Sequence, residues 1–168
     1  MKNNKRIFIR IIAFVIAAAI AVFIFAMSSQ SRKESANTSG GIIRKIAEFF
    51  NSEFQEMTET QQSEYIESFQ FIIRKTAHFS LYAALCFCLG VAMMTFSSLL
   101  YKWRYLIAYA SSVLYAVSDE VHQLFVPGRG CQFRDVCIDA CGAAFGLMVV
   151  WGCFFIYKKY VKKSNKSK

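Results

Sequence analysis

The stretch IIAFVIAAAIAVFIFAM, residues 11–27, decides the fold, because no charged side chain interrupts it. Together with the residues from position 7 onward, it approaches the roughly 20 apolar residues that an α-helix needs to cross a hydrocarbon core about 30 Å thick. We therefore predict a transmembrane helix over residues 7–27.

The rest of the chain also has the composition of a membrane protein. Hydrophobic residues make up 55% and aromatic residues 16% of the 168 positions, and there is a single proline. This is more apolar material than the core of a small soluble domain needs. Three further apolar stretches follow the first, and only the last two carry charges well inside them. The sequence predicts an all-α polytopic membrane protein, a single domain over residues 1–168, with four transmembrane helices at about 7–27, 76–100, 103–125 and 136–157.

The basic residues predict which ends face the cytoplasm, since short loops rich in lysine and arginine tend to stay inside. They cluster before the first span, at Lys102 and Arg104 between the second and third spans, and after the fourth span. Both termini are therefore predicted to be cytoplasmic. The glutamate-rich residues 28–74 and the loop around Pro127 are predicted to face outward.

The net charge of +9 is interpreted as this topology signal combined with attraction to anionic lipid. Membrane lipids are the expected partners, and nucleic acid is not, because no recognisable nucleic-acid motif accompanies the charge. The basic start, the apolar stretch and the small residues at 26–29 also fit a cleaved signal peptide. Cleavage would leave three spans and an outer amino terminus. The apolar run is long for a signal, which favours a retained span.

Residues 28–74 are predicted to form an extracytoplasmic helical insert. After a break at the Gly40-Gly41 pair, apolar residues recur at helical spacing between charged ones, which predicts an amphipathic helix. These apolar residues are Ile42, Ile43, Ile46, Phe49, Phe50 and Phe54. Thr58 and Gln61 resemble a capping box, from which a helical face leads toward the second span. Two interpretations remain open: a helical pair on the outer membrane surface, or a lid over a polar site.

The six cysteines show no paired CxxC spacing of the zinc or thioredoxin kind. We expect most of them to be small apolar packing residues. Cys131 lies in the outward loop and Cys137 lies near it, so the sequence leaves a disulfide between them open. We favour its absence.

Ionisable and polar side chains lie near the predicted outer ends of the last three spans. At about 100° per residue they form one stripe on each helix. The stripes are Lys75, His78 and Tyr82 in the second span, Tyr115, Asp119, His122 and Gln123 in the third, and Asp135 and Asp139 in the fourth. Glu120 points toward another face of the third span. Gly142 and Gly146 continue the fourth stripe, where they allow a neighbouring helix to approach closely.

Groups of this kind must find partners inside the helix bundle, because lipid offers none. A lone histidine in an apolar segment is more often structural than a ligand, and an aspartate facing a lysine often only neutralises it. Three stripes at equal depth favour a shared polar pocket that opens outward. Arg129, Gln132 and Arg134 in the adjoining loop are placed to add donors for a phosphate or a carboxylate.

The same residues resemble the VanZ family of small bacterial membrane proteins, from the first span to the fourth. The resemblance rests on the order and spacing of Ser28-Ser29-Gln30, of residues 75–82, of residues 118–123 and 126–129, and of Asp135, Asp139, Gly142 and Gly146. It implies as signature positions Lys75, His78, Tyr82, Asp119, Glu120, His122, Gln123, Arg129 and Asp135. Asp139, where asparagine is equally expected, and Cys131, where a small hydroxyl residue is usual, are variants.

The resemblance implies a multi-pass protein of the bacterial cell membrane that is associated with low-level teicoplanin resistance, without an obvious change of the peptidoglycan stem peptide. The first hypothesis is a binding protein. In this hypothesis Arg129 and Lys75 contact the head group of an envelope lipid, a lipid-linked envelope precursor or a lipoglycopeptide, and His78 and Asp119 orient those donors.

The second hypothesis is an intramembrane hydrolase or transferase acting on a lipid-linked substrate, with or without a divalent metal. Its catalytic and metal-binding candidates are the same four residues, His78, Asp119, His122 and Asp135. Asp-Glu-x-His is not the His-Glu-x-x-His zinc helix, and Lys75 would oppose a cation electrostatically. Metal-free acid–base chemistry by Asp119 and His122 is a variant. A proton-coupled carrier ranks last, because carriers place their sites near mid-membrane.

Overall fold

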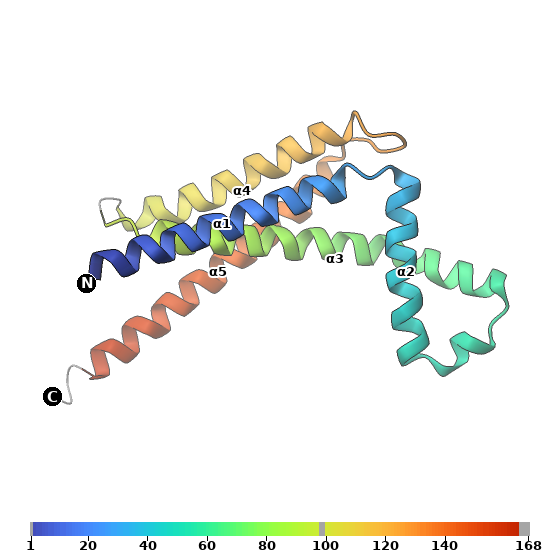
Figure 1. Cartoon of the computed structure of the whole chain (residues 1–168), viewed down its shortest axis with the longest axis horizontal. Coiled ribbons are helices and arrows are strands. Elements are labelled where there is room, and N and C mark those ends of the chain that lie inside the picture. The colour runs from blue at the N-terminus through green and yellow to red at the C-terminus, as the bar shows by residue number, and fades with distance from the viewer. Residues whose placement is uncertain (1, 98–99, 165–168) are drawn as a thin grey trace.

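The computed structural model describes residues 2–97 and 100–164, and in this part of the chain every regular element is a helix. The elements are α1 (Lys2–Ser28), α2 (Arg32–Phe50), the 3-10 helix η1 (Ser52–Glu56), α3 (Glu59–Met94), α4 (Tyr101–Gln123) and α5 (Phe133–Ser164). Helix α3 is central and packs against α1, α4 and α5, while α2 crosses its N-terminal part (Figure 1). The all-α prediction is confirmed.

Three helices among the described residues, not four, are long and apolar enough to cross a membrane. They are Asn3–Ser28, Glu59–Met94 and Phe133–Lys159. The predicted span at 103–125 does not meet this criterion. Helix α4 has the length, but two basic residues near its start, the acidic pair near its end and the tyrosines and serines between them lower its mean hydropathy.

The surface of α1 is apolar along most of its length. Phe8 and Val22 are 65% and 69% exposed, whereas the small side chains of Ala13 and Ala17 are buried against the bundle. Ala17 and Ile24 pack with the α3 and α4 residues of the main core. An exposed apolar surface of this extent is typical of a helix that faces lipid or another protein.

Helix α3 is a single helix of 36 residues, and at 1.5 Å per residue it is about 54 Å long. The predicted capping box is confirmed at its start, where the Thr58 hydroxyl accepts from the backbone of Gln61. The predicted span at 76–100 is therefore only the inner part of a longer helix, and it ends earlier, at Met94. The second half of the predicted insert is continuous with this span.

Helix α2 runs without interruption through Gly40 and Gly41, so the predicted break there is wrong. A capping box of Ser31 and Glu34 starts the helix. Its buried residues, Ser35, Ser39, Ile43 and Ala47, recur every four positions and form the face that packs on α3. Gly40 belongs to this contact, because a Cβ added there would lie 3.4 Å from Cγ2 of Ile66.

The amphipathic segment after Gly41 divides between two environments. Ile43 and Phe54 are buried in a small core with Ala47 and Ile66 of α3, while Phe49 and Phe50 are about four-fifths exposed. Ile66 precedes Lys75 by about 13 Å along the helix axis. The segment does not cover the polar stripes in this structure, and its placement on the membrane surface stays a prediction.

Helices α3 and α5 approach each other closely at two glycines. A Cβ at Gly142 would collide with the carbonyl oxygen of Phe79, and one at Gly146 with that of Ala83. The predicted role of these glycines in close helix packing is confirmed, and the contact lies within one chain. It places the start of α5 directly beside the His78 turn of α3.

Candidate functional site

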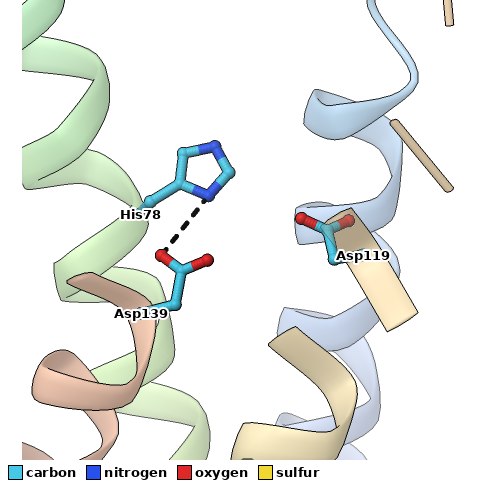
Figure 2. A group of neighbouring side chains, drawn as sticks. All are labelled: His78, Asp119 and Asp139. Carbon is cyan, nitrogen blue, oxygen red and sulfur yellow. Dashed lines mark ion pairs between the residues drawn. The ribbon is translucent and has the colours of Figure 1, made fainter. Parts of the chain in front are cut away.

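Three helices bring one residue from each predicted stripe together. His78 on α3, Asp119 on α4 and Asp139 on α5 each offer an atom within 4.8 Å of the others (Figure 2). Nδ1 of His78 lies 3.8 Å from Oδ1 of Asp139, and Asp119 faces this pair from the opposite side. We refer to these three residues as the His-Asp-Asp cluster.

The cluster is almost closed to solvent. Asp119 and Asp139 are 3% and 2% exposed, and the His78 side chain is 20% exposed, so His78 forms the accessible edge. Oδ1 of Asp119 and Oδ2 of Asp139 have no hydrogen-bond partner among the described residues, and neither does the buried hydroxyl of Tyr82. Buried polar atoms without partners are uncommon, because each one carries a desolvation cost.

The other oxygen of Asp119 is well satisfied. Its Oδ2 accepts a hydrogen bond of 2.8 Å from the Ser28 hydroxyl and one of 3.2 Å from the Gln123 amide. Ser28 is fully buried at the end of α1. Sequence reasoning did not name Ser28 as a site residue. The available signal was a hydroxyl residue at the end of an apolar span, opposite an acidic residue.

His122 does not join the cluster. Its Nε2 forms a 3.1 Å hydrogen bond with the Ser29 hydroxyl, and its ring lies 4.5 Å from the Phe25 ring, centroid to centroid. Both partners belong to the end of α1 or the turn after it. His122 therefore connects α4 to α1, and the candidate ligand set of His78, Asp119, His122 and Asp135 is not assembled in one place.

Asp135 and Glu120 are held by other partners. Asp135 forms an ion pair with Lys75 across the α3–α5 contact, and Nε of Arg134 lies 3.9 Å from its other oxygen. The buried Glu120 carboxylate accepts a 3.0 Å hydrogen bond from the Gln132 backbone, which fastens the loop between α4 and α5. Both carboxylates thus stabilise the end of the bundle that carries the loop between α4 and α5.

The loop between α4 and α5 adds Arg129, whose guanidinium donates to Oε1 of Gln123 and to the Met27 carbonyl, each at 3.4 Å. Burial lowers the pKa of Arg129, and the nearby positive charge of Arg74 lowers it further. The basic residues at this end form a group that we call the cationic rim. Its members are Arg74, Lys75, Arg129 and Arg134.

The predicted pocket above the cluster stays a prediction. An open hollow of about 540 Å³ lies between the end of α1 and the start of α2. Its lining residues are Ala26, Ser29, Gln30, Glu34, Asn37 and Thr38. Cys131 and Cys137 are both exposed and free, without a disulfide between them.

These features define a class: an all-helical protein with three candidate membrane spans and buried ionisable groups from three helices at one end of the bundle. A family model described as VanZ/LLP1 matches residues 13–157, and the chain belongs to this family. The match includes the whole cluster and the whole rim, and it confirms the resemblance seen in the sequence. No curated protein and no solved structure matches the chain.

Proposed function

We propose that this chain is a multi-pass protein of the bacterial cell membrane with both termini in the cytoplasm. Its cationic rim binds the anionic group of an envelope lipid, a lipid-linked envelope precursor or a lipoglycopeptide. Through this binding the protein acts in resistance to antibiotics of the teicoplanin type. Membership of the VanZ/LLP1 family supports the proposal at the level of the family.

The distribution of side chains on α4 supports a fourth membrane crossing. Asp119, Glu120 and Gln123 are buried inside the bundle, whereas Leu114 and Val121 are 69% and 48% exposed. A helix whose polar groups face its neighbours can cross a bilayer despite a modest mean hydropathy, because the lipid meets only its apolar side. The position of α4 alongside α1 and α3 in the bundle is consistent with this (Figure 1).

The observation that carries the proposed function is the pair of arginines in the rim. Arg74 has no carboxylate partner among the described residues, and its positive charge acts on the half-buried Arg129. Nearby carboxylates offset part of this repulsion at Arg129, and a bound anion would give the unpaired Arg74 a partner. Guanidinium groups also match the geometry of phosphate and carboxylate oxygens.

Teicoplanin susceptibility of a sensitive bacterium tests the proposal. The wild-type chain is expected to raise the inhibitory concentration, and Arg129→Gln and Arg74→Gln are expected to return it to that of cells without the protein. Arg44→Gln is the matched control, because Arg44 is exposed on α2 and donates only to Gln62. Immunoblots of the membrane fraction check equal insertion. Full protection by both rim variants contradicts the proposal.

A second candidate function is an intramembrane hydrolase or transferase acting on a lipid-linked substrate. The observation that favours it is the His-Asp-Asp cluster, which combines an imidazole with two buried carboxylates, the groups of general acid–base catalysis. Turnover of a polyprenyl phosphate by the purified protein, lost in Asp119→Asn and retained in Arg44→Gln, would support it. Protection that survives Asp119→Asn and Asp139→Asn removes it as the source of resistance.

A further inference from the structure

We infer that the His-Asp-Asp cluster is a binding site for a divalent transition-metal ion, with Zn²⁺ and Mn²⁺ as the two candidates. His78, Asp119 and Asp139 provide the ligands, one from each of three helices. This inference goes beyond the proposed function, because the cationic rim can bind an anion whether or not a metal occupies the cluster.

The spacing of the three side chains suits a single ion. Their candidate ligand atoms all lie within 4.8 Å of one another. Metal–ligand distances of about 2.0–2.2 Å place adjacent ligand atoms about 3 Å apart and opposite ones about 4.3 Å apart. Small rotations of the side chains are enough to bring the ligand atoms to the spacing that an ion requires, because the three groups already face a common space (Figure 2).

The balance of charge and hydrogen bonds is a second, independent argument. Asp135 also has an oxygen without a hydrogen bond, but Lys75 and Arg134 form ion pairs with it, and Glu120 accepts from the loop backbone. Asp119 and Asp139 each have one oxygen without a hydrogen-bond partner, both are almost fully buried, and among the described residues no lysine or arginine forms an ion pair with either. Two buried carboxylates that each keep an unpaired oxygen are costly in such a place. A divalent cation neutralises both charges and gives both unpaired oxygens a partner.

The ligand types indicate which metals fit. Imidazole suits zinc, iron, copper and nickel, carboxylates suit manganese and magnesium, and a mixed set of one imidazole and two carboxylates favours Zn²⁺ or Mn²⁺. The unpaired hydroxyl of Tyr82, within electrostatic reach of both aspartates, is available to a water molecule in the remaining coordination positions.

The positive charge of Lys75 is partly offset at the cluster. Its ammonium group forms an ion pair with Asp135, one helical turn before Asp139 on α5. The partly exposed edge of His78 gives the ion a path from the surface. A bound ion would connect α3, α4 and α5, so it would also stabilise the bundle against unfolding.

Metal content of the full-length protein in detergent tests the inference. After dialysis against Zn²⁺ or Mn²⁺, mass spectrometry is expected to find one ion per chain, and Asp139→Asn and His78→Gln are expected to weaken binding by at least about tenfold, the scale on which even indirect ligand changes act. Glu64→Gln is the control, because Glu64 is exposed on α3 more than three helical turns before His78, and it is expected to retain the ion.

Thermal unfolding shows whether each variant is folded, so that a loss of binding is not confused with a loss of structure. The ion is expected to raise the unfolding temperature of the wild type, because it binds only the folded state, and to leave that of His78→Gln unchanged. A wild type that binds neither ion overturns the inference, as does equal binding by wild type and Asp139→Asn. Infrared spectroscopy provides a further check. If the band of a protonated carboxyl group persists after metal is added, the two aspartates share a proton, and the inference is overturned. Arg129→Gln is expected to keep the ion, which separates this test from that of the rim.

Discussion

Asp119 illustrates how a buried carboxylate can be half satisfied. One oxygen accepts hydrogen bonds from Ser28 and Gln123, while the other has no partner. Ser28 in turn accepts a weaker bond of 3.4 Å from Gln123. The hydroxyl at the end of α1 therefore orients Asp119 toward the cluster and joins the first helix to the fourth.

We predict that Ser28→Ala lowers the free energy of unfolding by about 1–3 kcal/mol, the cost of removing one donor from a buried charged group. Ser118→Ala is the control, because the exposed Ser118 hydroxyl bonds only to a carbonyl of its own helix, and we expect a change below about 0.5 kcal/mol. Denaturation in mixed micelles measures both. Equal effects of the two substitutions would contradict this role of Ser28.

At the scale of single residues, the sequence predicted which polar side chains lie near one another in depth better than it predicted which of them make contact. Helical spacing placed His78, Asp119 and Asp139 near one level, because depth along a helix follows directly from residue number. It could not separate His122 from them. Whether His122 faces α3 or α1 depends on the rotation of α4 about its axis, which tertiary packing sets.

The contact of α3 with α5 is the element that brings the cluster together. Gly142 and Gly146 face the backbone of α3 at Phe79 and Ala83, with no room for a side chain at either glycine. This close approach brings Asp139 within reach of His78 and Asp135 within reach of Lys75. Small residues at four-residue spacing are typical of such helix pairs.

Gly146→Ala is expected to destabilise the protein by about 1–3 kcal/mol, because the added methyl group forces the two helices apart. Gly152→Ala provides the matched control on the same helix, where no atom lies within 4 Å of an added Cβ. It is expected to stabilise by about 0.5–1 kcal/mol through helix propensity. The two substitutions thus differ in sign, and thermal unfolding in detergent compares them. The same sign for both would show that the glycine contact is unimportant.

Among the helices, caps were easier to predict than breaks. The box of Thr58 and Gln61 is a local pattern, and the structure confirms it. The predicted helix break at Gly40-Gly41 was wrong, because the packing of α2 on Ile66 and Gln70 of α3 outweighs the poor helix propensity of glycine. That packing involves residues distant in sequence, which local patterns do not reveal.

Across the whole molecule, the helix ends next to the basic segments that the sequence predicts as cytoplasmic lie together. The start of α1, the end of α3, the start of α4 and the end of α5 are at this end, and the loop from α4 to α5 is at the opposite end (Figure 1). This agrees with one membrane face for the basic segments, which sequence predicted from lysine and arginine positions. The sequence predicted the helical class and three spans that have the required length and hydropathy in the structure. The buried polar groups of α4 lower its mean hydropathy, so its crossing stays a proposal.

Cysteine labelling tests the proposed orientation. A membrane-impermeant maleimide is expected to label the exposed Cys131 and Cys137 in intact cells, and Cys131→Ser combined with Cys137→Ser is expected to remove this signal. The control is Ser97→Cys in this double-serine background, since residue 97 is exposed at the other end of the bundle. It is expected to react only after permeabilisation. The reverse pattern would place the loop from α4 to α5 in the cytoplasm and contradict the orientation.

The unbroken course of α3 has a mechanical consequence. No hinge separates its first turns, which carry Tyr65 and Ile66 in the small core with α2, from the turns that carry Lys75 and His78. A tilt of the first turns of α3 is therefore transmitted along the unbroken helix to the side chains of Lys75 and His78. Bending must concentrate in the short non-helical connections on either side of α2 and η1.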